Sequence, residues 1–231
     1  YSFGGDRYCS GYSGSRNESA AAMIFKSAQA CGVNPQVLLV TLQKEQTLVS
    51  APKSQTTYLR AMGYGCPDNV GGVCDPDYAG FHVQVYYAAR QYLRYADSSL
   101  FTRYPVGKFS SIQFHPNSSC GSSRVFIENQ ATRGLYLYTP YQPNAAAMAA
   151  GTGAGDGCSA YGNRNFYYQF TDWFGSTGQT SSNPAGAVES WTPIAGGIRV
   201  TGWSVDPNSD SAVSLRVKSG DVVAARASAN R

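Results

Sequence analysis

The chain has 231 residues, of which 42% are hydrophobic and 14% are charged, and its formal net charge is +4. No apolar run reaches the roughly 20 residues that a membrane-spanning helix needs, so we expect a soluble protein with no membrane partner. The small positive surplus, without any run of Lys and Arg, argues against nucleic acid as a partner. The length predicts one sizeable core with a small appendage, in a monomer.

Cysteine usage indicates a disulfide-bonded protein. The six cysteines form no CxxC pair and only two histidines are present, so we expect no metal site and no cofactor. An even cysteine count in a chain with few charges is typical of secreted, extracellular proteins, whose export signal would already have been removed. The pairs that preserve chain order are Cys9–Cys31, Cys66–Cys74 and Cys120–Cys158. Of these, Cys66–Cys74 is the strongest prediction because it closes a short loop, and other pairings remain open.

The first half of the chain carries helix signals. A helix over the Ala-rich stretch 20–25 should stop near Gly32, because glycine favours the left-handed C-cap position. Asn34 can cap the next helix, and Pro35 fits its first position. Residues 78–95 carry apolar side chains at helical spacing and predict a third helix.

Further helices are expected after an irregular or partly extended segment over residues 101–123. One of them should begin at Ser123 or Asn129 and run to Tyr138. Two more are predicted from Pro143 and over residues 163–174. The fold class expected for this part of the chain is therefore mainly α.

The last part of the chain changes character. All 17 tyrosines lie at or before Tyr168, and the stretch that follows is small and polar. We therefore predict a helical domain over 1–178, a flexible linker over 179–186 and a β-rich accessory segment over 187–231. Apolar residues alternate there as in half-buried strands, but the segment is short for a complete sandwich, so it is expected to be a partial, β-sandwich-like module.

Glu45 is the strongest candidate for chemistry. It shares a predicted helix face with apolar neighbours three, four and seven residues before it and three and four after it. These neighbours are Leu38, Thr41, Leu42, Leu48 and Val49. A carboxyl buried on such a face would have a raised pKa, which a general acid working near neutral pH needs. The alternative is a surface residue at a polar helix end, marked by Lys44 and Gln46.

Three blocks of sequence resemble the lysozyme superfamily, especially its goose-type lysozyme and soluble lytic transglycosylase branch. The blocks are residues 32–45, ending in Leu-Gln-Lys-Glu, residues 80–93 and residues 127–144. The resemblance implies a lysozyme-like helical domain in which Glu45 acts as general acid on β-1,4 bonds of a peptidoglycan-like, N-acetylated polysaccharide. It also implies a protein associated with a cell wall. Gln46 departs from the Ser usual in the family, and the Gly-Leu-Met-Gln block is missing near residues 61–68.

A second carboxylate is needed if the reaction is an ordinary glycoside hydrolysis. Asp68 is the leading candidate, with Asp75 and Asp77 in the same predicted loop and Glu128 further along the chain. Turn and cap chemistry is the alternative for the loop aspartates, and a place in the first turn of a helix is the alternative for Glu128. The resemblance also implies a route without a second carboxylate, in which one Glu donates a proton and then accepts one while the substrate acetamido group assists.

Four residues are candidates for substrate binding. Tyr138 and Tyr141 lie three apart and could share a face, where their rings would offer apolar surfaces to sugar CH groups. Gln84 and Asn129 could bind acetamide groups. The alternatives are a core position for Tyr138 and structural hydrogen bonding for the two amides.

Three functions remain open on the sequence. The first is a secreted glycosidase or lytic transglycosylase, with hydrolysis and anhydro-ring formation undecided. The second is a carbohydrate-binding or adhesive protein without turnover, which Gln46 and the missing block favour. The third is a glycosidase acting on another polysaccharide such as chitin.

Overall fold

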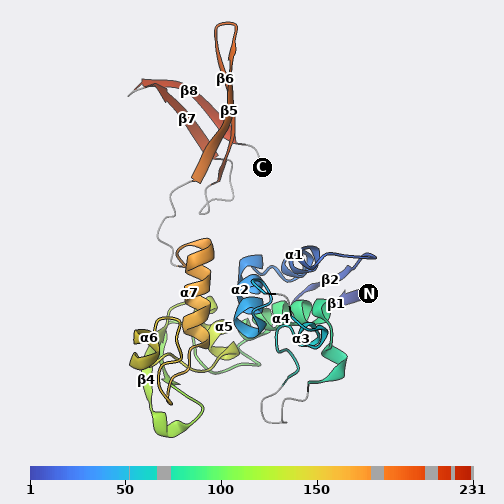
Figure 1. Cartoon of the computed structure of the whole chain (residues 1–231), viewed down its shortest axis with the longest axis vertical. Coiled ribbons are helices and arrows are strands. Elements are labelled where there is room, and N and C mark those ends of the chain that lie inside the picture. Colours follow the sequence, from blue (N-terminus) through green and yellow to red (C-terminus); the bar gives the residue numbers. More distant parts are fainter. Residues whose placement is uncertain (52, 67–73, 178–184, 206–212, 220–221, 230–231) are drawn as a thin grey trace. The chain divides into compact units, whose positions relative to one another are not determined.

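The computed structural model describes residues 1–51, 53–66, 74–177, 185–205, 213–219 and 222–229. The chain divides into two compact units, Tyr1–Gly175 and Ser176–Arg231 (Figure 1). The predicted second catalytic carboxylate, Asp68, lies outside the described residues, as does most of the expected linker.

The first unit combines helices with two short β-hairpins (Figure 1). Its helices are α1 (Ala20–Cys31), α2 (Pro35–Gln46), α3 (Gln55–Leu59), α4 (Phe81–Ala96), α5 (Gln130–Tyr138), α6 (Ala145–Ala149) and α7 (Gly162–Phe174). Its 3₁₀ turns are η2 (Pro76–Tyr78) and η3 (Ser118–Cys120). Its hairpins pair β1 (Ser2–Gly5) with β2 (Ser10–Ser13) and β3 (Lys108–Gln113) with β4 (Ser122–Ile127).

The helix boundaries follow the capping chemistry of the sequence. The side chain of Asn34 accepts a hydrogen bond from the Gln36 amide and Pro35 opens α2, as predicted. Gly32 ends α1 in the left-handed conformation, with φ 63°. However, α2 ends at Gln46 because Thr47 is also left-handed, with φ 59°. The expectation that Leu48 and Val49 extend the helix face of Glu45 was therefore wrong.

Helix α4 forms the centre of the first unit. Its Val85, Ala88 and Ala89 have no exposed surface, and they belong to the same hydrophobic core as Leu38 and Leu42 of α2. Helices α1, α2, α3 and α5 all contact α4 (Figure 1). The apolar face of α4 is therefore buried in the core. The other faces of the helix carry its polar and aromatic side chains.

A second, smaller core lies under the β3–β4 hairpin. Ile112 and Ile127 are fully buried there, together with Tyr104. The outward side of the same hairpin pairs Phe109 with Phe126, both exposed. Residues 101–123, expected to be irregular or partly extended, thus contain one strand of a regular antiparallel pair.

The three predicted disulfide bonds are confirmed. Cys9–Cys31 joins the end of the first hairpin to the last residue of α1, Cys66–Cys74 closes a short loop, and Cys120–Cys158 joins η3 to the segment before α7. Each cysteine belongs to one of these bonds, and none is free in the described part of the chain. Of the three bonds, Cys9–Cys31 ties an irregular segment to a helix, and the other two join irregular segments and turns of the first unit to one another.

We expect the purified protein to incorporate no alkylating label without reductant, and six labels after reduction in denaturant, by intact mass. Replacing Cys120 and Cys158 together by Ser should lower the free energy of unfolding by roughly 2–4 kcal/mol, because the bond closes a span of 38 residues in the unfolded chain. Denaturant unfolding with the disulfides otherwise intact measures this. A labelled thiol before reduction would contradict the pairing.

The second unit consists of two separate antiparallel hairpins in its described residues. These are β5 (Ala185–Ile194) with β6 (Gly197–Val205) and β7 (Val213–Ser219) with β8 (Val222–Ala229). The first two residues of β5 were expected in the linker. Trp191 pairs with Val200 across β5 and β6, and both side chains are exposed.

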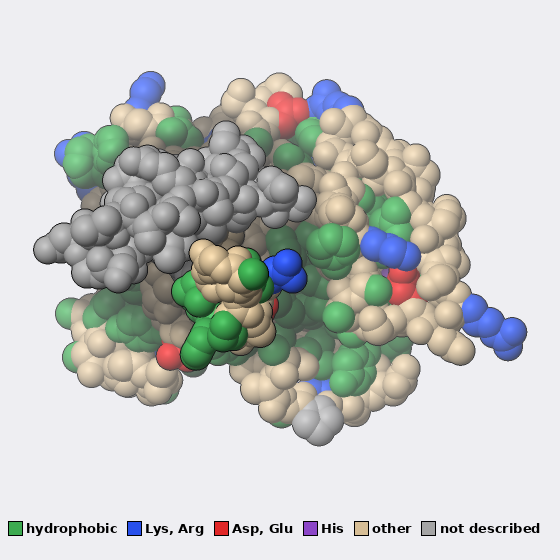
Figure 2. Space-filling view, turned by 90° about the horizontal axis from the view of Figure 1, so that it is seen from above, with side chains coloured by type: hydrophobic (Ala, Val, Ile, Leu, Met, Phe, Trp, Pro, Cys, Tyr) green, Lys and Arg blue, Asp and Glu red, His purple; other side chains and the backbone are tan. Residues whose placement is uncertain are grey.

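The described surface shows no concentrated positive charge on the face seen in Figure 2, where Lys and Arg side chains are separated from one another. Among the described helices, none combines the length and apolar character required to cross a membrane. Within the same residues, no group of three or more His, Cys, Asp or Glu side chains is arranged to hold a metal ion.

Candidate active site

Glu45 lies in the last turn of α2 and remains accessible. Its side chain is 27% exposed, and its Oε1 atom is 2.8 Å from Nζ of Lys44. Its Oε2 atom lies on the side of Gly63, where an added Cβ would be 3.9 Å away. The carboxylate is therefore half-buried between an ammonium group and a glycine, rather than enclosed by the apolar side chains that the helix spacing predicts.

Lys44 is more deeply placed than its neighbour. Its side chain is only 10% exposed, and its ammonium donates a hydrogen bond of 2.8 Å to Oγ1 of Thr139. The same ammonium lies 4.7 Å from the centre of the Tyr138 ring, within the range of a cation–π contact. Lys44 thus connects the end of α2 to the end of α5 and fixes one oxygen of Glu45.

Two tyrosines form the aromatic wall of this site. The rings of Tyr92 from α4 and Tyr138 from α5 stack with centroids 5.4 Å apart. Burial raises the pKa of both phenols above its usual value, and the negative charge of Glu45 adds to the rise. Both phenols therefore stay neutral across the physiological pH range, and both lie within electrostatic reach of Glu45.

Each phenol hydroxyl has a protein partner. Tyr138 donates to the carbonyl of Met62. Thr41 donates its own proton to the carbonyl of Val37, so Tyr92 is the donor in the 3.1 Å bond between the Tyr92 and Thr41 hydroxyls. Tyr138 was predicted to bind substrate, but its hydroxyl and its ring are occupied by the protein. It shapes the wall beside Glu45 instead of presenting a free ring.

The loop beside Glu45 is held by Gln84. The Gln84 amide oxygen accepts from the backbone N–H groups of Met62 and Tyr64, both at 3.1 Å. Its nitrogen donates to the carbonyls of Tyr64 and Tyr78 at 2.8 and 2.7 Å. The side chain is 1% exposed, so the prediction that Gln84 binds substrate gives way to the alternative, a structural hydrogen-bonding role. Gln84 positions Gly63, which faces Glu45.

Asn129 and Tyr141 also have structural roles. Asn129 is the N-cap of α5, and its side-chain oxygen accepts from the backbone and the hydroxyl of Thr132 at 2.9 and 3.1 Å. Tyr141 lies beyond the end of α5 and forms a backbone bridge with Gln113. Because the helix ends at Tyr138, Tyr138 and Tyr141 do not share a helix face, which corrects the spacing argument.

The other candidate carboxylates are not joined to Glu45 by any described contact. Asp75 caps η2 by accepting from the backbone of Asp77 at 3.0 Å, which is the turn role that the sequence left open. Asp77 and Glu128 are exposed. Among the described residues, Lys44 contacts the Glu45 carboxylate, and the two phenols lie close enough for its charge to affect their pKa values.

Sequence reasoning missed Lys44, Thr139 and Tyr92 as members of the site. Adjacent residues on a helix point in different directions, so spacing alone gave no reason to pair Lys44 with Glu45. Tyr92 carried a partial signal, since it lies on the predicted apolar face of its helix. Its position near Glu45 depends on how α4 packs beside α2, which no local pattern reveals.

The arrangement can perform proton transfer. It offers a partly exposed carboxylate with one oxygen on the side of a glycine, the other oxygen fixed by an ammonium, and two neutral, stacked phenols nearby. Comparisons of the chain with protein-family models, curated proteins and solved structures return no match. The function is therefore argued from this geometry and from the residues that carry it.

Proposed function

We propose that this protein is a secreted enzyme that cleaves β-1,4 bonds of a peptidoglycan-like, N-acetylated glycan, with Glu45 as general acid. The observation that carries the proposal is the position of Glu45. Its carboxylate is accessible, yet three separate elements hold its surroundings, namely the loop 61–65, α4 and α5. A proton donor needs this combination of access and fixed geometry.

In the proposed reaction, Oε2 of Glu45 transfers a proton to the glycosidic oxygen. Lys44 holds Oε1, so Oε2 on the Gly63 side is the oxygen that substrate can reach. The bond between the anomeric carbon and the leaving oxygen breaks as that oxygen gains the proton. Gly63 leaves room for a sugar ring because it has no side chain, and its φ of 69° disfavours any other residue.

The second half of the proposed reaction uses the same carboxylate as a base. The substrate acetamido oxygen attacks the anomeric carbon and holds the intermediate. Water or a hydroxyl of the same sugar then attacks the anomeric carbon and displaces the acetamido oxygen, while Glu45, now ionised beside the Lys44 ammonium, removes the proton from the attacking oxygen. Water gives hydrolysis and a reducing end, whereas the sugar hydroxyl gives an anhydro ring. This route needs no second carboxylate. The two phenols near Glu45 are neutral and so do not take the place of one.

The three disulfide bonds support a proposed location outside the cell or on its wall, because such bonds persist in oxidising compartments. The experiment that tests the proposed function is incubation of the protein with purified peptidoglycan and, separately, with chitin. Mass analysis of the soluble products distinguishes the two outcomes, because an anhydro product is lighter than a hydrolysis product by one water. If neither polymer gives products, the enzyme proposal is wrong for these substrates.

A glycan-binding protein without turnover is the second candidate. The observation in its favour is the Lys44–Glu45 ion pair, because it engages one oxygen of the carboxylate in a contact within the protein. Saturable binding to peptidoglycan with no released product, at any pH between 4 and 8, would select this function over the enzyme.

We expect the second unit to be dispensable for chemistry. A chain ending after Gly175, the last residue of the first unit, should cleave a short soluble oligosaccharide at a rate near that of the full chain, because Glu45, Lys44, Gly63 and the two phenols all belong to the first unit. Binding to intact walls should weaken. Rates on soluble and insoluble substrate measure the two effects. Loss of turnover in a truncated chain that retains its helical circular dichroism would contradict this division.

A further inference from the structure

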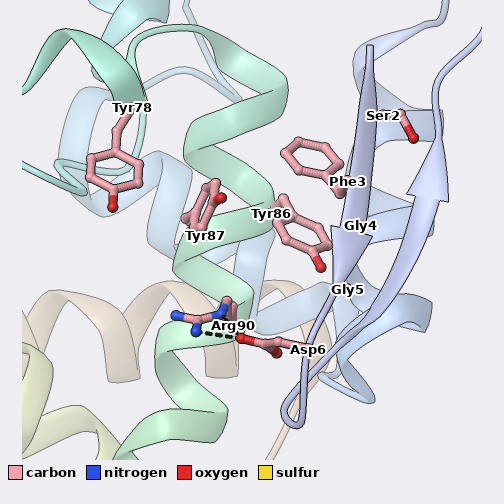
Figure 3. Close-up of a pocket in the computed structure, with 9 residues that line it drawn as sticks. All are labelled: Ser2, Phe3, Gly4, Gly5, Asp6, Tyr78, Tyr86, Tyr87 and Arg90. Carbon is pink, nitrogen blue, oxygen red and sulfur yellow. Dashed lines mark hydrogen bonds and ion pairs between the residues drawn. The ribbon is translucent and has the colours of Figure 1, made fainter.

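A pocket of about 370 Å³ lies between β1 and α4, apart from the Glu45 site (Figure 3). Arg90 of α4 lines this pocket, and Tyr92, two residues further along the same helix, belongs to the Glu45 site. Two residues correspond to about 200° of rotation around a helix axis, so the two side chains leave α4 in nearly opposite directions. The volume is at the lower end of the range of small-molecule sites, roughly 300–1,000 Å³.

The pocket contains a row of aromatic rings (Figure 3). From η2 across α4 to β1, consecutive ring centroids of Tyr78, Tyr87, Tyr86 and Phe3 are 5.0, 5.5 and 4.0 Å apart. Tyr86 stacks in parallel on Phe3, donates its proton to the carbonyl of Ser10 and is only 3% exposed, so it supports the neighbouring rings and offers little surface to a ligand. The hydroxyls of Tyr78 and Tyr87 have no hydrogen-bond partner among the described residues.

An ion pair closes one end of the pocket. Figure 3 shows the guanidinium of Arg90 directed at the carboxylate of Asp6. The other oxygen of Asp6 accepts from the backbone of Tyr8 and Cys9 at 2.8 and 3.1 Å. The two charges cancel, so the site favours a neutral polar ligand over an ion. Both groups are only partly exposed, with side-chain exposures of 21% for Arg90 and 31% for Asp6, and so present a fixed donor and acceptor.

The backbone of β1 completes the pocket. Gly4 lines it, and a Cβ added there would meet no atom within 4 Å. β1 pairs with β2 along one edge only in the described sheet. Its glycine backbone is therefore open to close approach by a ligand.

We propose that this pocket is a second saccharide site, which binds one or two units of a neutral pyranose glycan without cleaving it. Most of the exposed lining is polar: the hydroxyls of Tyr78 and Tyr87, which have no partner among the described residues, the Asp6–Arg90 pair and the Gly4 backbone offer partners to sugar hydroxyls, while the partly exposed rings of Tyr78 and Tyr87 offer apolar surface to sugar CH groups. The inference is independent of turnover at Glu45, because no group is shared by the two sites.

The test is a titration of the full-length Glu45→Gln protein with the soluble trimer of N-acetylglucosamine, followed by ¹H–¹⁵N NMR. We expect saturable shifts of the Gly4 and Gly5 amides and of the Arg90 Nε–H, with a dissociation constant of about 1 mM. The Gly63 amide reports separately on the Glu45 site. Shifts at Gly63 without shifts at the pocket would overturn the second site and leave the proposed function standing.

Conservative variants show whether the phenols bind the sugar. Tyr78→Phe and Tyr87→Phe remove hydroxyls that have no partner in the described protein, so both variants should fold normally. Each should weaken pocket binding by about threefold to tenfold, the effect of one hydrogen bond. Tyr161→Phe, at an exposed tyrosine elsewhere, is the matched control and should have no effect. Unchanged affinity in the double variant, or saturable pocket shifts with a trialanine peptide in place of the sugar, would refute the assignment.

Discussion

Replacing Glu45 by Gln is expected to reduce glycan cleavage by at least about a hundredfold, the lower end of the effect of losing a general acid. The amide cannot donate an acidic proton or accept one in return. Its oxygen can still accept a hydrogen bond from Lys44, which contacts Oε1 at 2.8 Å in the native protein. The variant should therefore keep its fold, and the loss should appear in kcat more than in KM. Initial rates of product release from peptidoglycan measure it.

Glu128→Gln is the matched control. Glu128 is exposed and lies between β4 and α5, so the same chemical change there should leave the rate nearly unaltered. Equal melting temperatures and circular dichroism spectra for the two variants would show that neither effect comes from unfolding. Near-native turnover by the Glu45→Gln variant would remove Glu45 from the mechanism.

Replacing Gln84 by Leu is expected to lower the free energy of unfolding by at least about 3 kcal/mol. The change leaves four backbone groups of residues 62, 64 and 78 without their partner, and each unsatisfied buried group costs about 1–3 kcal/mol. Some of this cost is relieved if water enters. Activity should fall with stability, because Gln84 holds the loop that carries Gly63. Chemical denaturation at neutral pH measures the stability change.

Gln84→Glu is a sharper variant, because its effect depends on pH. A carboxyl at this buried position can accept from the two N–H groups, but it can donate to a carbonyl only while it is protonated. Burial and the carbonyls would raise its folded pKa above the unfolded value of about 4.3. The variant should therefore be closest in stability to the native protein below pH 4, where its one O–H pairs one of the two carbonyls, and should lose stability as pH rises above it. A constant stability difference between pH 4 and pH 8 would contradict the hydrogen-bonding role of Gln84.

Local signals in the sequence predicted most of the helices, because caps and periodicity act over a few residues. Asn34 with Pro35 and the glycine at position 32 marked their boundaries correctly. The end of α2 was missed because Thr47 adopts a left-handed conformation that is uncommon for threonine. The β3–β4 pair was missed in detail because its register depends on contacts between strands rather than on spacing within one strand.

The site was only partly predictable for a different reason. Glu45 could be singled out because a carboxylate in an apolar pattern is unusual. The roles of the candidate amides could not be predicted, because the sequence shows that residue 84 is Gln but not whether its amide binds a sugar or four backbone groups. Only the folded chain shows that its hydrogen-bonding capacity is used internally. The pairing of Tyr92 with Tyr138 likewise requires two helices, separated in sequence, to meet.

The Cys66–Cys74 bond has a consequence for how this protein could change its specificity. The two Cα atoms are 4.0 Å apart, and the Asp75 amide donates to the carbonyl of Gly65 at 2.8 Å. The disulfide and this hydrogen bond therefore hold the two ends of the segment next to each other. The entropic cost of closing a loop grows only with the logarithm of its length. Residues between the two cysteines could therefore be exchanged or lengthened with little penalty to folding. New recognition sequences could thus be introduced between Cys66 and Cys74, by evolution or by design, while the helices that hold the Glu45 carboxylate remain unchanged.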